Sequence, residues 1–274
     1  MELTRCCWIL ASSMVLGIAS AGLAGDWGHQ DPKVPVDYTP DSWELKVAPY
    51  GFLTALDGNL DVGNLSADFG GDFSDILQNL DFAAFVGTSA KKGAVSIYND
   101  FLYAGLSPGG ANRQGLYNQI DLEMDMLIWN GAVTYRFWDE KDFFLELGGG
   151  VRFMYLSTEI SAHSAILRNR PLLAAATGLP AFANTSSVSH VWDGVGVVRL
   201  GYDFSDRWLI RAYGDFGGGD SDFTWQAMVN VGYVVCESAT AFLGYRYLSY
   251  EFSQGIVSMD MSFSGPQLGV AIEF

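Results

Sequence analysis

The chain has 274 residues, of which 49% are hydrophobic, 14% aromatic and only 17% charged, and its formal net charge is -16. The charged share lies below the roughly 25% of ordinary soluble domains. A soluble protein so poor in charge needs long apolar helices or a large α/β core, and the sequence shows neither pattern. The acidic balance argues against nucleic-acid binding, because no basic stripe is present to displace counterions from phosphates.

The N-terminal segment has the pattern of an export signal. Arg5 precedes an apolar run, and the tripeptide Ala-Ser-Ala at 19–21 fits the small-x-small motif of a cleavage site. Cleavage after Ala24 is the alternative. We therefore predict a signal peptide over 1–21 and an N-terminal linker over 22–42. A membrane anchor is the competing interpretation, but the apolar run is short and no charges flank its end.

From about residue 43 onward, apolar and polar residues alternate over long segments. In TWQAMVNVGYVV, every second residue from Trp225 to Val235 is apolar. FFLELGGGVRFMYL (143–156) and DRWLIRAYGDF (206–216) follow the same rule. Alternation with period two over about ten residues predicts a strand with one apolar and one polar face.

The length of these segments distinguishes a membrane barrel from a soluble β-sandwich, whose strands also alternate. Soluble strands average about 5–6 residues, whereas a tilted strand that crosses a membrane needs about 9–11. Aromatic residues also gather near the ends of the apolar faces, as in the interfacial girdles of membrane barrels. They are Trp43, Phe143, Tyr155, Tyr202, Trp208, Trp225, Tyr233 and Phe274. The sequence therefore predicts an all-β fold, an antiparallel transmembrane β-barrel over 43–274.

The expected connections between strands alternate strictly between short and long. Short polar turns are predicted at 90–93, 138–142, 204–207 and 236–239. Longer connections are predicted at 56–79, 106–116, 157–189, 217–222 and 252–257. Membrane barrels have short periplasmic turns and longer external loops, so the alternation assigns a side to each connection. The pattern predicts about ten strands, with eight or twelve as alternatives, near 43–55, 80–90, 93–105, 117–137, 143–156, 190–203, 207–216, 222–235, 240–251 and 258–274.

Two segments complicate this strand count. A full crossing within 61–80 would leave an odd total, so we expect an external or lumen-folded excursion there. Ser74 is the expected cap of a helical turn in this excursion. In 119–137 the apolar face changes parity near Asn130 and Gly131, which predicts a β-bulge at the glycine.

The last strand, within SFSGPQLGVAIEF (262–274), ends on an aromatic residue. Its final eight residues resemble the C-terminal assembly signal of Gram-negative outer-membrane barrels. Gln267, Gly269, Ile272 and Phe274 stand at the four characteristic positions of that signal. The segments 206–233 and 242–252 are also similar to a porin-like, OmpA-type outer-membrane family of no assigned activity. The resemblance implies a barrel integral to the bacterial outer membrane, with outer-membrane lipid, lipopolysaccharide and the barrel-assembly machinery as partners.

If Phe274 faces lipid, alternation places charged residues of both signs in the lumen. A barrel of about eight strands is just wide enough to be filled by its own side chains. Paired carboxylates and guanidiniums would fill such a lumen with charge-assisted hydrogen bonds, or would line a narrow pore. The predicted lumen network consists of Glu44, Lys46, Asp100, Asp121, Glu123, Asp125, Glu146, Arg152, Asp193, Arg199, Arg211, Asp215 and Arg246.

The histidines offer the main test for an enzyme, because nucleophilic catalysis needs a base, usually histidine, beside the nucleophile. His29 lies in the predicted linker, whereas His163 and His190 flank one predicted external loop. The His-x-Ser-Asn pattern of barrel deacylases is absent from the sequence. We therefore expect no catalytic residue. A lipid-modifying or proteolytic outer-membrane barrel enzyme using His163 or His190 is the alternative.

Acidic clusters such as Asp68, Asp72 and Asp75 lack the spacing of calcium or zinc sites. We therefore expect neither a metal nor a cofactor. The sequence predicts a small outer-membrane barrel with a structural role or a narrow porin-like role, which would pass ions or small solutes passively.

Overall fold

The computed structural model describes residues 42–62, 65–78, 80–107, 119–164, 168–169, 182–254 and 257–274. The predicted signal peptide (1–21) and the predicted linker, except for Ser42, lie outside the described residues. In the described part of the chain, no helix has the length and hydrophobicity that crossing a membrane requires.

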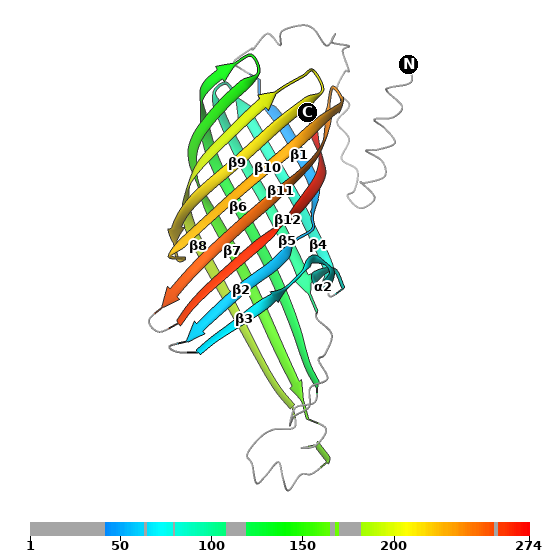
Figure 1. The fold of residues 1–274 in the computed structure, drawn as a ribbon, viewed down its shortest axis with the longest axis vertical. Coiled ribbons are helices and arrows are strands. Elements are labelled where there is room, and N and C mark those ends of the chain that lie inside the picture. The colour runs from blue at the N-terminus through cyan, green and yellow to red at the C-terminus, as the bar shows by residue number, and fades with distance from the viewer. Residues whose placement is uncertain are drawn as a thin grey trace.

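Ten antiparallel strands form a closed barrel (Figure 1). They are β1 (Glu44–Phe52), β4 (Leu80–Lys92), β5 (Val95–Leu106), β6 (Gln119–Glu140), β7 (Phe143–His163), β8 (Phe182–Asp203), β9 (Trp208–Gly219), β10 (Phe223–Cys236), β11 (Ala239–Gln254) and β12 (Val257–Glu273). Each strand pairs with the next in this order, and β12 returns to β1, with Val47 opposite Ile272. Closure gives backbone partners to both edges of the sheet, as lipid requires. The predicted barrel is confirmed.

Two further strands extend the sheet at one end of the barrel. β2 (Ala55–Val62) continues β1 along the same edge of β12, with Ala55 opposite Ser264. β3 (Leu65–Gly71) turns back along β2, and the short helix α2 (Phe73–Gln78) leads into β4. The segment expected as an excursion thus adds no crossing of its own.

The cap of α2 differs from the prediction. The Asp72 carboxylate accepts hydrogen bonds from the backbone N–H groups of Ser74 (2.8 Å) and Asp75 (3.0 Å), so Asp72 caps the helix. The Ser74 hydroxyl also donates to this carboxylate. These bonds, that of the Ser74 hydroxyl first, lower the pKa of Asp72. The prediction of Ser74 as cap is wrong because the helix begins at Phe73, which places Ser74 inside the first turn and Asp72 at the N-cap position.

The two ends of the barrel carry different connections. Short turns follow β4, β6, β8 and β10, at the end where β12 finishes and the C-terminus lies (Figure 1). In the first of these turns Gly93 has a φ of 65°, a conformation that suits glycine. At the opposite end, β5 and β6 are joined over 107–118 and β7 and β8 over 164–181, both partly outside the described residues, whereas β9 and β10 are joined over 220–222 and β11 and β12 over 255–256. The long connections predicted at 217–222 and 252–257 are therefore wrong, because β9, β11 and β12 extend into these segments. We call the end that carries the C-terminus the periplasmic end, and the opposite end, which carries the connections β5–β6 and β7–β8, the external end.

Three strands run beyond the others at the external end (Figure 1). We call this part the arm: residues 119–126 of β6, 156–163 of β7 and 182–192 of β8. Much of it was predicted as a loop over 157–189, and that prediction is wrong. The described side chains of 182–190 are exposed on both faces of the strand, so this part of the arm has no apolar face to reveal a strand.

The register of β6 is continuous from Gln119 opposite His163 to Arg136 opposite Glu146, and it shifts only between Arg136 and Trp138. The predicted β-bulge at Gly131 is therefore wrong. Consequently the even-numbered residues of β6 from Met126 to Arg136 face the lumen.

Aromatic residues form two girdles on the outer face. Near the external end, four adjacent strands carry aromatic residues directly opposite one another: Phe101, Trp129, Phe153 and Trp192. Near the periplasmic turns a second group is exposed on the outer face: Tyr135, Phe137, Trp138, Phe143, Tyr202 and Trp208. Amphipathic rings take such positions at the two surfaces of a bilayer.

Candidate functional site

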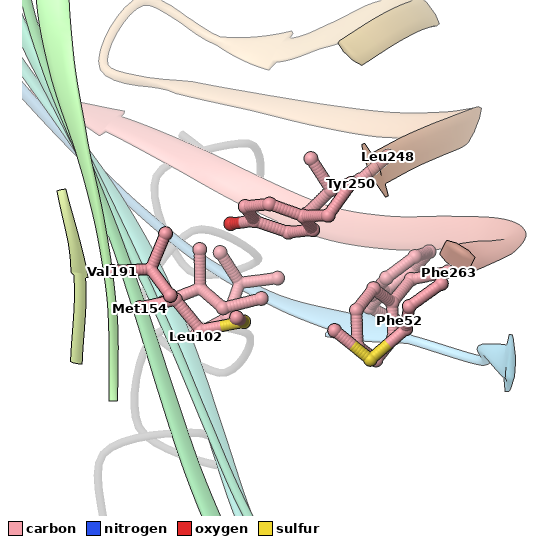
Figure 2. Close-up of a cluster of buried hydrophobic side chains, with 9 residues drawn as sticks. Phe52, Leu102, Met154, Val191, Leu248, Tyr250 and Phe263 are labelled. Carbon is pink, nitrogen blue, oxygen red and sulfur yellow. The ribbon is translucent and has the colours of Figure 1, made fainter. Parts of the chain in front are cut away.

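The interior of the barrel contains an apolar layer toward the external end. Nine side chains from seven strands are buried in this layer: Phe52, Leu102, Ile128, Met154, Val191, Leu248, Tyr250, Met261 and Phe263. Figure 2 shows Leu102, Met154 and Val191 on one wall, facing Leu248 and Tyr250 across the lumen. Leu248 and Tyr250 have an exposed fraction of 0%.

A polar layer lies next to the apolar one, and Arg246 on β11 is one of its two centres. Its guanidinium donates to the Tyr50 hydroxyl (2.8 Å) and twice to the Gln226 carbonyl oxygen (2.7 and 3.1 Å). It also forms a short ion pair with Asp100. These partners lie on β1, β10 and β5, so one side chain joins distant walls of the barrel. Arg246 is only 1% exposed.

Arg152 on β7 is the second centre of the polar layer. One guanidinium nitrogen lies 2.7 Å from each carboxylate oxygen of Asp215 on β9. The remaining nitrogens donate to Thr224 (2.6 Å) and to Asn130 (2.7 Å). The Arg152 and Asp215 side chains are both 0% exposed. Charge-assisted bonds of this length are the strong class of hydrogen bond.

Glu146 lies deeper toward the periplasmic end, where two arginines share it. Arg136 and Arg199 donate to its carboxylate at 2.8 and 2.7 Å. The Tyr98 and Thr134 hydroxyls donate to the same group at 3.0 Å each. The Arg199 guanidinium also lies 3.5 Å from the centre of the Tyr98 ring. A fully buried carboxylate is thus compensated by charge and hydrogen bonds together.

Below these groups the lumen opens into a vestibule at the periplasmic end. This cavity has a volume of about 490 Å³. It runs from Lys46 and Glu273, an exposed ion pair of 2.9 Å at the mouth, to Tyr50, Asp100 and Arg246 at its inner end. Charged side chains of both signs line it, so it has the chemistry of a polar recess with no net preference for anions or cations.

The structure brings most of the predicted lumen residues together. The buried members are Glu146, Arg152, Asp193, Asp215 and Arg246. The members that line the vestibule are Glu44, Lys46, Asp100, Arg199 and Arg211. Among these, Arg211 pairs with Asp203 at 2.5 Å. Asp193 accepts the backbone N–H of Ser221 (2.9 Å) and holds the turn after β9.

The acidic residues of β6 are the exception. Glu123 and Asp125 are exposed, and they share the parity of Trp129, whose ring lies on the outer face. The Tyr103 hydroxyl donates to Asp125 at 2.8 Å on that face. Placing them in the lumen was wrong, because the prediction assumed a bulge at Gly131. Asp121 has the same parity, but its side chain lies outside the described residues.

Sequence reasoning missed the uncharged half of the polar layer and one arginine. The residues are Tyr50, Tyr98, Asn130, Thr134, Arg136, Thr224, Gln226 and Gln267. The alternation of lipid-facing and lumen-facing residues would also have placed these side chains in the lumen if uncharged polar residues had been considered together with charged ones. Arg136 lies after Gly131 and shares the parity of Thr134, so the expected bulge did not change its face and the same alternation would have found it.

The residues of the assembly signal meet the first strand. The Phe274 N–H donates to the Leu45 carbonyl (2.9 Å), and the Phe274 side chain is 74% exposed. A Cβ atom at Gly269 would lie 2.6 Å from the Pro49 carbonyl oxygen, so β1 and β12 approach closely only because this residue is glycine. Gln267 donates to Asn230 in the lumen at 2.6 Å.

The surroundings of His190 do not resemble a catalytic site. Its ring packs against Phe153 (6.2 Å between centroids) and Tyr155 (5.3 Å) on the outer face. The side chain of His163 lies outside the described residues. In the described part of the chain, no three His, Cys, Asp or Glu side chains are placed to hold a metal ion.

No protein-family model and no curated protein matches the sequence. Solved structures do match it. The outer membrane protease OmpT from Escherichia coli has a TM-score of 0.56 at 10% identity, covering 89% of this chain and 100% of OmpT. Neisserial surface protein A (NspA) has a TM-score of 0.33 at 10% identity, over 85% of this chain and 97% of NspA.

The Pseudomonas putida toluene transporter TodX has a TM-score of 0.36 at 9% identity, over 86% of this chain and 90% of TodX. At such low identities only the fold is shared, and OmpT shares it over its whole length. The protein therefore has the closed ten-stranded β-barrel fold of Gram-negative outer-membrane proteins.

Proposed function

We propose that the protein is an exported, integral outer-membrane barrel with a structural role, and that its lumen is sealed. The observation that carries this proposal is the pair of stacked layers across the lumen. Arg246 joins β11 to β1 and β5, and Arg152 joins β7 to β9 and β10. The apolar layer lies directly against them, with the Arg152 guanidinium 5.7 Å from the centre of the Tyr250 ring.

Physical chemistry supports a closed interior over an open one. An ion that crosses the barrel has to pass both the guanidinium pairs and the nine buried side chains of the apolar layer, of which only Tyr250 carries a polar group. Barrels that hold an open aqueous channel have about sixteen or more strands, whereas about eight strands are filled by their own side chains. Ten strands lie close to the filled limit. The vestibule is then a recess that ends at Arg246.

The alternatives have less support. A narrow porin-like role would require transient separation of both layers. A proteolytic role is suggested by the name of OmpT alone, and a likeness at 10% identity brings no catalytic residues with it. The aromatic surroundings of His190 favour packing over proton transfer.

Conductance across a planar bilayer tests the proposal. Refolded wild-type protein is expected to show no steady conductance step. The double variant Arg246→Ala with Tyr250→Ala removes one large side chain from each layer, and we expect steps to appear in it. Steady conductance of the wild type would contradict the sealed lumen and would support the porin-like role instead.

A further inference from the structure

Within the part of the chain that the structure describes, one edge of β8 in the arm has no neighbouring strand. Pairing of β8 with β9 reaches outward only to Asp193, opposite Gly219. At the next residue, the Trp192 N–H donates to the Asp220 carboxylate (2.8 Å) and the Trp192 carbonyl accepts the Asp220 N–H (3.0 Å). Alternate residues of an antiparallel strand direct their backbone groups to the same edge. The residues that share this edge with Trp192 are Asn184, Ser186, Val188 and His190. Within the described residues, their backbone groups on this edge have no partner.

This edge lacks the devices by which proteins protect exposed edges. Charged residues, proline and bulges normally prevent an exposed strand from pairing with other chains. Residues 184–192 contain no charged residue and no proline, and their pairing with β7 shows no register shift. The opposite edge of the arm, on β6, carries Asp121 and Glu123. The open edge of β8 is thus a template for a further strand.

The negative charge of the arm indicates which side chains a partner strand would carry. The described acidic side chains of the arm are Glu123, Asp125 and Glu159, and its described residues include no lysine or arginine. Glu159 lies on the strand next to the open edge, where Asn184 donates to it at 2.8 Å. A neighbouring strand with basic side chains would meet this charge, and its apolar side chains would meet Val188, which is 53% exposed.

A second copy of the same protein does not fit this edge. Two copies in one membrane direct their arms the same way, so their β8 strands would run parallel. A twofold axis would place each residue of this edge opposite the same residue of the second copy. The backbone N–H and C=O groups of both residues would then point toward each other's strand. A parallel ladder instead requires that one of two opposite residues directs its backbone groups away. A symmetric dimer through this edge is therefore excluded.

We infer that the open edge of β8 binds an extended, basic segment of another protein outside the cell, which adds to the arm as a strand. Main-chain hydrogen bonds would supply affinity, and alternate side chains would supply specificity. The inference depends on the external placement of the arm and does not depend on whether the lumen is sealed.

A peptide of alternating lysine and valine, ten residues long and labelled with a fluorophore, probes the edge directly. Its binding to refolded full-length protein in detergent micelles is followed by fluorescence anisotropy. In the variant Val188→Pro the edge loses the N–H at the centre, a change that edge strands tolerate. We expect binding about tenfold weaker or worse, the loss that one to two net hydrogen bonds would give. Val188→Ala keeps the N–H and should bind about as well as the wild type.

Two peptide controls separate strand addition from simple charge attraction. A peptide with proline in place of valine keeps the charges but cannot form the ladder, and it should bind far more weakly. A peptide of alternating glutamate and valine should not bind. Equal binding by wild type and Val188→Pro would overturn the inference, as would failure of the lysine–valine peptide to bind the wild type.

Discussion

Arg246 shows how a single side chain can hold a barrel interior together. It leaves β11, crosses the lumen and reaches partners on three other strands, each through a hydrogen bond or an ion pair. Burial of a guanidinium costs several kcal/mol in desolvation, and only a complete set of partners offsets that cost. Removal of the arginine leaves Asp100 and Gln226 without that donor.

Arg246→Ala is therefore expected to lower the free energy of unfolding by about 3–5 kcal/mol, the usual cost of breaking a buried ion pair. Urea unfolding in detergent, followed by tryptophan fluorescence, measures the change. Lys46→Ala is the matched control, because the Lys46 and Glu273 side chains are 44% and 43% exposed. An exposed pair contributes about 1 kcal/mol or less. Equal losses in the two variants would indicate a water-filled lumen.

At the residue scale, alternation predicted which charged residues face the lumen. It predicted less well which of these residues form ion pairs with one another. Asp193 lies directly opposite Arg152 in the ladder. Arg152 nevertheless pairs with Asp215, one strand further on, and Asp193 binds the backbone of Ser221 instead. Partners across a lumen depend on the tilt and stagger of all the strands, and no local pattern in the sequence records these.

At the scale of a single element, β6 shows how one assumption about the backbone moves a whole set of side chains. A register shift at Gly131 would have reversed the faces of everything before it. The observed shift lies after Arg136 and leaves the acidic residues outside. The residues around Gly131 alternate too weakly to locate the shift, because small and polar residues occupy both faces.

The two placements of Asp125 predict different reactivity. In Asp125→Cys, the thiol should react readily with a membrane-impermeant maleimide on intact cells, because the residue is exposed on the outer face near the external end. Asp100→Cys, inside the barrel next to Arg246, should stay protected. If the thiol in Asp125→Cys were protected from the maleimide, residue 125 would face the lumen, as the sequence had predicted.

The last strand makes a prediction about assembly. Deletion of Phe274 removes both an exposed aromatic ring and the final backbone bond to Leu45. We expect the amount of folded, heat-modifiable protein in the outer membrane to fall severalfold. Phe274→Tyr keeps the ring and the backbone and should assemble normally. Normal assembly of the deletion variant would leave the C-terminal signal without a role in this protein.

At the scale of the whole molecule, the orientation of the barrel is inferred from its connections, because those between β5 and β6 and between β7 and β8, which are longer, lie at the end opposite the C-terminus. Arg168 lies in the connection between β7 and β8, beyond the arm, and is exposed. Lys141 lies in the short turn between β6 and β7 and is also exposed.

Trypsin added to intact cells should therefore cleave after Arg168 and spare Lys141, which should be cut only after the cells are ruptured. Mass measurement of the fragments distinguishes the two sites. Cleavage after Lys141 in intact cells would mean that the barrel is inserted the other way round.

The number of crossings and the position of most strands were predictable from the sequence, because lipid on one side and a polar lumen on the other impose a strict alternation. The arm and the hairpin of β2 and β3 were not, since they lie beyond the membrane and that alternation is absent there. The apolar layer was missed for a related reason: it occupies the inward face, where only polar residues were expected.

The seam between β1 and β12 also has a kinetic consequence. It joins the first and last strands of the barrel, whereas every other pair joins consecutive barrel strands, with β2, β3 and α2 lying between β1 and β4. The entropy of closing so large a loop makes this the slowest contact to form. On one edge β12 meets β1 along its periplasmic half and β2 along its external half. The hairpin of β2 and β3 can therefore pair with the external half of β12 first and bring β1 next to the periplasmic half. In the final step of folding, the hydrogen bonds between β1 and β12 then form in order from the external end toward the periplasmic end.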